Sequence, residues 1–245
     1  GSAKRKFVAS AEIVGDKVMV KARFGCYAEV MVDSSAILIL YLTLLQSSAT
    51  LTMLSTAFSS LAAILLTIPG AAIASRIGLR RTYAASCYIG CAGMLLMAAA
   101  PVLDAPLDRY AVLLGCLVYG LSRPLYGVTW YPMLDNVLLP AERAPFFGTL
   151  RFSYLALTAS SFFLISLAMG KDPPVWALQV VVGVVGVLLL GRKCCLDRLP
   201  VEPHRRSRYD LRLTLAIAIR NRPLVGWAVY TCCLTLASSA LLPLT

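Results

Sequence analysis

Long apolar segments recur along the chain and are separated by short polar loops. Each is close to the ~20 residues that an α-helix needs to cross a bilayer core of about 30 Å. The pattern predicts an all-α membrane protein, a six-helix transmembrane bundle with a partial seventh span that starts near Pro223. The six predicted spans cover residues 27–46, 50–73, 83–101, 110–131, 150–169 and 175–191.

Basic residues fall almost entirely on every second loop. Of the 23 Lys and Arg residues, nearly all lie in the N-terminal tail or in the second, fourth and sixth loops, whereas the opposite loops hold only Arg109 and Lys171. Cytoplasmic loops are enriched in Lys and Arg. The pattern therefore predicts an integral protein of the plasma (cytoplasmic, or inner) membrane whose N-terminus lies in the cytoplasm.

Composition agrees with a membrane protein. The chain is 59% hydrophobic and 14% charged, with a mean hydropathy of +0.76; average soluble domains carry about 25% charged residues. A net charge of +11 would suit a nucleic-acid partner, but the basic residues flank the spans. Topology and anionic lipid account for that placement, so the predicted partner is the lipid bilayer and not a nucleic acid.

The predicted organisation has four parts. Residues 1–24 form a basic cytoplasmic arm, and 25–191 form the six-span unit. Residues 192–222 form a basic cytoplasmic linker that can hold an interfacial helix. Residues 223–245 start a seventh span that is cut short. Because the chain begins with Gly-Ser and ends in an apolar run, we expect it to be a piece of a longer protein.

Three ionisable residues are predicted at membrane depth: Glu29, Asp33 and Arg123. Each costs about 2.5–3.5 kcal/mol at the centre of a lone helix, so they should face the bundle interior or one another. Glu29 and Asp33 are four residues apart and share a helix face. Asp33 and Arg123 both lie roughly 12 Å from the cytoplasmic edge. We expect these two to pair, either as a functional pair lining a cavity or as a structural one; Asp33 at the interface is the remaining alternative.

Small residues punctuate the third and sixth predicted spans. Gly90 and Gly93 lie in one, and Gly183 and Gly186 in the other. In lipid, small residues let helices approach closely. We interpret these glycines as packing positions and not as part of a chemical site.

The loop after the second span, residues 71–81, resembles the cytoplasmic signature of the major facilitator superfamily, G-x-L-a-D-R-x-G-R-R. The chain departs from this signature at Ala71, Ser75 and Leu79. A glycine permits a tight turn. The resemblance implies a cytoplasmic gate motif made of Arg76, Gly78, Arg80 and Arg81.

Two more segments resemble the same family. Residues 123–127 fit its R-x-x-q-G pattern, with Tyr126 at the usual Gln position, and residues 140–148 fit P-x-E-R-g-x-x-x-G. The resemblance implies that Arg123 acts in proton coupling or in binding an anionic group. Tyr126 is expected to face a cavity, whereas Trp130 and Tyr131 are expected in the aromatic belt at the membrane surface. The antiporter signature of the fifth span is missing.

The resemblance implies the N-terminal half of a secondary active transporter that moves a small solute by alternating access, with the site between two six-helix halves. Its expected partners are the solute, a proton if transport is coupled, and the missing C-terminal half. The alternative is a non-transporting scaffold or receptor on the same fold. We expect no enzyme, because no catalytic set lies at membrane depth. The cysteines read as small apolar residues and the single histidine is His204, so no metal or cofactor site is predicted.

Overall fold

The computed structural model describes residues 27, 36–135, 140–170, 173–196, 220–223, 225–226, 229–230 and 233. Every regular element within these ranges is a helix. The elements are α2 (Ala36–Leu44), α3 (Ala49–Ile77), α4 (Leu79–Ala99), the short 3₁₀ helix η1 (Ala100–Val102), α5 (Leu107–Asp135), α6 (Pro140–Met169) and α7 (Val175–Leu196).

Four of these helices are long and apolar enough to cross a membrane. Among the residues that the structure describes, the candidate spans are Leu79–Val102, Leu107–Leu134, Ala141–Met169 and Val175–Cys194. Helix α3 covers the second predicted span with 29 residues. These helices support the prediction of an all-α integral membrane protein. Residues 28–35 of the first predicted span and most of the seventh lie outside the described residues.

The chain divides into two compact units, residues 1–205 and 206–245. The division falls inside the predicted linker, residues 192–222. In the second unit, the described positions around residues 222–230 are mostly helical, and the amide of Val225 donates to the carbonyl of Asn221 at 3.0 Å. The remaining description concerns the first unit alone.

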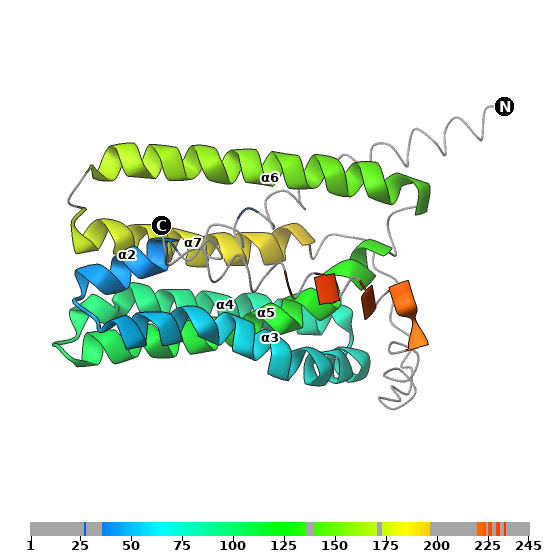
Figure 1. The fold of residues 1–245 in the computed structure, drawn as a ribbon, viewed down its shortest axis with the longest axis horizontal. Helices are drawn as coiled ribbons and strands as arrows, with labels where there is room; N and C mark the ends of the chain where they lie inside the picture. The colour runs from blue at the N-terminus through cyan, green and yellow to red at the C-terminus, as the bar shows by residue number, and fades with distance from the viewer. Residues whose placement is uncertain are drawn as a thin grey trace. The chain divides into compact units, whose positions relative to one another are not determined.

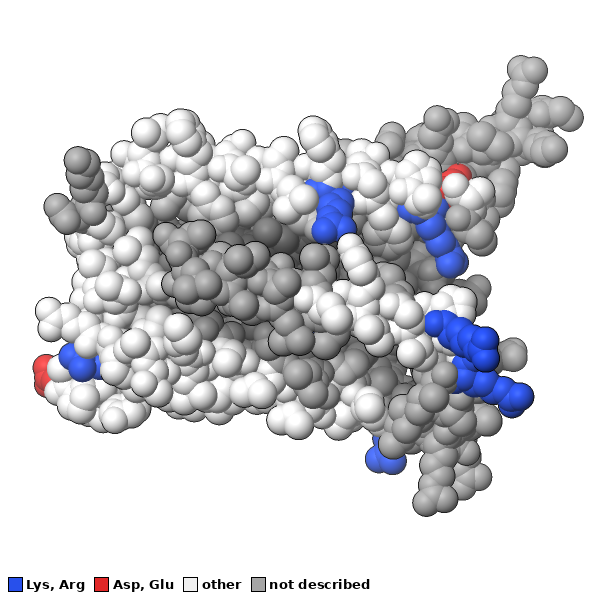
Figure 2. All heavy atoms as spheres, viewed as in Figure 1, with Lys and Arg blue, Asp and Glu red and all other residues white. Residues whose placement is uncertain are grey.

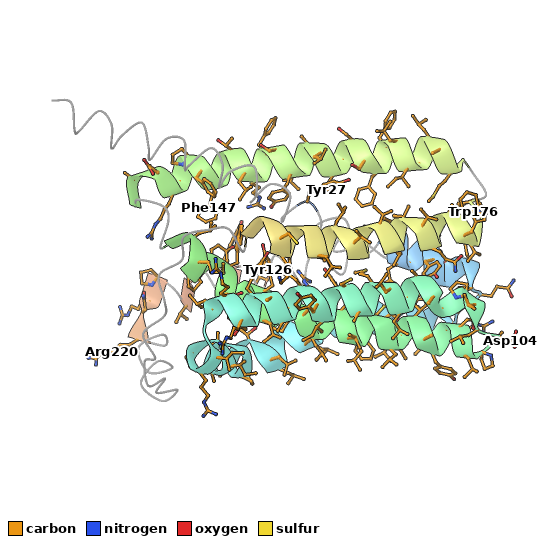
Figure 3. All side chains as sticks on the ribbon, turned by 180° about the vertical axis from the view of Figure 1, so that it is seen from behind. Tyr27, Asp104, Tyr126, Phe147, Trp176 and Arg220 are labelled. Atoms are coloured by element: carbon orange, nitrogen blue, oxygen red, sulfur yellow. The ribbon has the colours of Figure 1, made fainter. Side chains whose placement is uncertain are left out.

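Helix α5 is central to the packing of the first unit. It packs along both α4 and α3, and α7 packs on the other side of α4. Figures 1 and 3 show α3, α4 and α5 side by side, with α7 beside α4 and α6 set apart from the other helices. The connections between consecutive helices are short, so neighbouring helices run antiparallel.

Several helices continue past the predicted ends of their spans. Helix α3 ends at Ile77 and α4 begins at Leu79, so the expected loop shrinks to Gly78. Gly78 has a φ of +96°, a conformation that favours glycine, which confirms the predicted tight turn. Arginine side chains can extend to water from the last turn of a membrane helix. A helix can therefore include arginines that a charge count assigns to a loop.

Helices α4 and α5 cross at backbone contact. A Cβ added at Gly93 would lie 2.6 Å from the amide nitrogen of Tyr119, and one at Gly115 would lie 2.8 Å from the carbonyl oxygen of Gly93. On the other side of α4, a Cβ at Gly186 of α7 would lie 3.0 Å from the Cβ of Met94. These contacts confirm that small residues set the helix spacing here.

The buried core has two clusters, near opposite ends of the helices. One contains Tyr83, Tyr126, Trp130 and, from the start of α6, Phe146 and Leu150. The other gathers apolar side chains of α2, α4, α5 and α7 around the end of α4. Near that second cluster, the carbonyls in the last turn of α4 accept hydrogen bonds from other helices. The last carbonyls of an α-helix lack the usual donor four residues further on, and here the carbonyl of Met97 also accepts from the backbone amide of Ala100.

Two side chains make those hydrogen bonds. The hydroxyl of Tyr41 in α2 donates to the carbonyl of Met97 at 2.8 Å, and the amide of Gln179 in α7 donates to the carbonyl of Ala98 at 3.0 Å. Each bond spans two elements far apart in sequence. The second fixes the start of α7 against the end of α4.

Helix α6 is the least buried of the four candidate spans. Beyond its first turns it presents large apolar side chains such as Phe152 and Phe163 outward. A hydroxyl–hydroxyl hydrogen bond of 2.7 Å joins its Ser161 to Tyr27, in the first predicted span. An outward apolar surface of this kind suits a helix that faces lipid.

Candidate functional site

Positive charge gathers at one end of the first unit, which we call the basic end. There α3 ends, α4 and α6 begin, and α5 and α7 end. Figure 2 shows the Lys and Arg side chains of the described helices concentrated at this end. At the opposite end, Arg109 lies beside acidic neighbours, and its amide donates to the carboxylate of Asp108 at 2.7 Å.

The structure places the predicted gate motif at the basic end. Arg76 lies in the last turn of α3, Arg80 and Arg81 lie in the first turn of α4, and all three are exposed. Gly78 lies between the two helices. The three arginines therefore flank the turn at Gly78, with their side chains on the surface of the basic end.

The predicted pair of Asp33 and Arg123 stays a prediction, because Glu29 and Asp33 lie outside the described residues. Arg123 is partly buried in α5. Its neighbour Pro124 lies inside the same helix and has no amide hydrogen, so the carbonyl of Gly120 loses its usual helical donor. Helix α5 thus lacks one of its backbone hydrogen bonds in the turn that precedes Pro124, next to Arg123.

Arg192 is the residue that the sequence interpretation missed. It was counted with the linker, but the structure places it inside α7, 3% exposed. Its guanidinium carbon lies 4.0 Å from the centre of the Tyr126 ring and 5.7 Å from that of Tyr83. Its Nη2 donates to the sulfur of Cys87 at 3.8 Å. A cation over an aromatic face contributes about 0.5–2 kcal/mol, more when water is excluded.

Aromatic rings extend the contact around Arg192. Tyr126 stacks on Trp130 at 5.6 Å between ring centres and 29° between planes, and it meets Tyr83 at 5.9 Å and 50°. Figure 3 shows Tyr126 inside the bundle. We call the group of Tyr83, Cys87, Tyr126, Trp130 and Arg192 the Arg192 cluster. It joins α4, α5 and α7 at the basic end.

Trp130 corrects one prediction. It was expected in the aromatic belt at the membrane surface, but it is only 5% exposed and stacks on Tyr126 within the bundle. Tyr131, the next residue, is 61% exposed, as a belt residue should be. Adjacent residues point about 100° apart on a helix, so one faces the bundle and the other faces outward.

Local helix geometry explains how the Arg192 cluster forms. Tyr83 and Cys87 are four residues apart in α4, as are Tyr126 and Trp130 in α5, so each pair shares a face. Side chains of a helix lean toward its N-terminus. Arg192 lies four residues before the end of α7, so its side chain leans into the bundle and not toward the aqueous end.

In the structure, Arg192 continues a stripe of buried positions along α7, which the sequence does not distinguish because almost every residue of 175–191 is apolar. The buried positions of this helix are spaced by four and three residues, as expected for one face of a helix. The stripe ends on a guanidinium: Leu178, Val182, Val185, Leu189 and Arg192.

Two arginines flank Tyr126. Arg192 lies over its ring, and Arg123 precedes it by three residues on the same helix, about one turn deeper in the bundle. Guanidinium groups bind carboxylates and phosphates in a planar, bidentate way and stack on aromatic faces. The arrangement is chemically suited to an anionic or aromatic group that reaches this depth.

No protein-family model matches this chain, and no curated protein matches it. The likeness to the major facilitator superfamily therefore rests on the sequence motifs quoted above.

Proposed function

We propose that this chain is the N-terminal half of a secondary active transporter of the major facilitator type. The observation that carries the proposal is the Arg192 cluster beside Arg123. Ionisable residues inside a bundle of membrane-spanning helices are costly, and they commonly mark the path of a substrate or a proton. Here two arginines flank one buried tyrosine, Tyr126.

The gate motif supports the same proposal. A one-residue turn at Gly78, with an arginine on each side, suits a gate that must stay compact while the helices around it move. In the proposed orientation the basic end faces the cytoplasm, because Lys and Arg are retained on that side. The membrane is the plasma (cytoplasmic) membrane in this proposal.

In the proposed mechanism, the solute binds near the bilayer midplane between this half and a C-terminal half, and the two halves rock around it. Arg123 and Tyr126 line this half of the site. Arg123 binds an anionic group of the solute or shifts the protonation of Asp33. Because one wall of the cavity belongs to the other half, the chain alone is not expected to transport.

The test is transport by the natural polypeptide that contains this chain, reconstituted in liposomes. Concentration jumps of benzoate, succinate and glucose would be applied and charge movement or uptake recorded. Arg123→Gln should reduce the transported flux at least about tenfold, a loss of about 1.4 kcal/mol. Arg123→Lys should retain part of it. Arg109→Gln, at the opposite end, is the matched control and should leave the flux unchanged.

The scaffold or receptor alternative makes the opposite forecast. If the protein is a scaffold or receptor, Arg123 only stabilises the helix bundle. Arg123→Gln would then lower the stability of the protein, and neither the parent nor the variant would transport a solute. Folded, reconstituted protein with no flux for any of the three solutes, and no response to the substitution, would count for this alternative.

A further inference from the structure

Helix α7 is attached to α4 differently at its two ends. At its start, Gln179 donates to the backbone carbonyl of Ala98 at 3.0 Å. At its end, the contacts with α4 include two cations over aromatic rings and one long N–H···S contact. Arg192 faces Tyr83 and Cys87 inside the bundle, and Lys193 lies 5.4 Å from the ring of the exposed Tyr88.

Between these ends, α7 and α4 approach closely at two glycines. A Cβ at Gly186 would lie 3.0 Å from the Cβ of Met94, and a Cβ at Gly90 would lie 3.2 Å from a methyl of Leu189. Arg192 lies six residues beyond Gly186, about 9 Å along the helix. The close contact and the hydrogen bond from the Gln179 side chain hold the first part of α7, and Arg192 and Lys193 contact α4 in its last two turns.

We propose that Arg192 is a positioning residue that keeps the basic end closed by holding the end of α7 against α4 and α5, and that its release opens a path to Cys87. The role of this opening rests on the proposed function, in which it is the cytoplasmic opening of the transporter. It goes beyond the family motifs, none of which includes Arg192.

The contact is suited to reversible opening. The guanidinium on the ring face and the N–H···S contact of 3.8 Å are two of the interactions of Arg192, and both are less directional than a short hydrogen bond to a carbonyl. The ring under the guanidinium is Tyr126, which follows Arg123 by one helical turn. A change at Arg192 therefore reaches the proposed solute site through one side chain.

Two buried native cysteines provide reporters at the two ends. Cys87 is fully buried beside Arg192, whereas Cys116 is buried toward the opposite end, where its thiol contacts the sulfur of Met97 at 3.5 Å. Two single-cysteine proteins would be made by replacing the other seven cysteines with alanine. The full chain in lipid nanodiscs would be labelled with N-ethylmaleimide, and the rate of adduct formation followed by mass.

Arg192→Met is the main variant and Lys193→Met is its matched control. Lys193 is the next residue, carries the same charge and also lies over a ring, but that ring faces outward. We expect Arg192→Met to raise the labelling rate of Cys87 at least about tenfold while Cys116 changes less than about twofold, the pattern of a local opening. Lys193→Met should change neither rate by more than about twofold.

A second pair of variants keeps the charge in place. Tyr126→Phe retains the ring under Arg192 and should leave the Cys87 rate near that of the parent, whereas Tyr126→Leu removes the ring and should raise it. This pair decides the question if Arg192→Met does not fold. Arg192→Lys keeps a cation in reach of the rings and should give an intermediate rate.

Trp130 gives an independent readout of positioning. With Trp176 and Trp227 replaced by Phe, the emission of Trp130 reports on its stack with Tyr126. We expect Arg192→Met to change this emission and Lys193→Met to leave it unchanged. A residue that acted only through overall stability would not separate these two neighbours in a protein that remains folded.

Equal acceleration at Cys87 and Cys116 would overturn the proposal, because it would mean that Arg192 supports the whole bundle. An unchanged rate at Cys87 in Arg192→Met would overturn it as well. Neither measurement uses a solute, so the two proposals fail separately. Selective exposure of Cys87 in a protein without flux would remove the transport proposal and leave a bundle that opens at its basic end.

Discussion

Single hydroxyl groups join helices of this bundle, and Tyr41 is the clearest case. Its side chain is fully buried and donates to the carbonyl of Met97 at 2.8 Å. Tyr41→Phe keeps the ring and removes the donor, so it should lower the free energy of unfolding by about 0.5–1 kcal/mol. Unfolding in mixed micelles by added SDS would measure the change. Tyr110→Phe, at an exposed tyrosine near the start of α5, should have no effect.

The placement of single residues also shows what the sequence could not decide. Tyr126 was expected to face a cavity; it is buried inside the bundle, and both the cavity and its role as a site residue stay predictions. Arg192 was assigned to the linker because basic residues usually lie in loops, and Trp130 to the aromatic belt because tryptophan is frequent at the membrane surface. Both residues lie near helix ends, and these frequencies do not determine which side chains there face the bundle. Which face of a helix packs inward depends on its neighbours, and those are set by contacts between residues such as Cys87 and Arg192, 105 positions apart.

At the scale of elements, the crossing of α4 and α5 depends on the absence of a side chain. An added Cβ at Gly93 would meet backbone atoms of α5, which cannot move aside as a flexible side chain can. Gly93→Ala should therefore lower the free energy of unfolding by about 1–3 kcal/mol. The SDS titration of the Tyr41 variant would measure this loss.

Gly127 provides the matched control for that substitution. It lies in α5, and nothing lies within 4 Å of a Cβ added there. Gly127→Ala should be neutral or stabilising by up to about 1 kcal/mol, because alanine loses less entropy in a helix. Equal losses at the two glycines would contradict the close crossing of α4 and α5.

Apolar runs in the sequence predicted the helices well and their ends poorly. Lipid-facing segments must be apolar for their whole crossing, so the third to sixth predicted spans coincide with α4 to α7. The helices extend further at the basic end because arginines at their ends can reach water without ending the hydrogen-bonded helix. Gly78 was recognisable because only a residue that tolerates positive φ closes so short a turn.

At the scale of the first unit, the two ends of the helix bundle differ both in charge and in the contacts that join the helices. The exposed arginines Arg76, Arg80 and Arg81 lie at the end where the Arg192 cluster is, and the hydrogen bonds of Tyr41 and Gln179 lie at the other. Side-chain cations contact aromatic rings at one end and backbone carbonyls accept side-chain hydrogen bonds at the other, and we propose that the first of these ends is the one that opens. The positive-inside rule predicts that this end faces the cytoplasm.

This orientation can be tested in intact cells with a cysteine-free chain and a maleimide that does not cross membranes. Ala141→Cys places a thiol at the exposed start of α6, at the basic end, and Asp104→Cys places one in the exposed turn before α5, at the opposite end. Because arginines resist translocation, only Asp104→Cys should label in intact cells, and both should label after the cells are opened. Labelling of Ala141→Cys alone would show that the basic end faces outward, so the proposed opening at Arg192 would lie on the outer side of the membrane. Labelling of both in intact cells would mean that α5 and the short segment before α6 do not separate the two thiols by a bilayer, which would contradict a membrane-spanning α5.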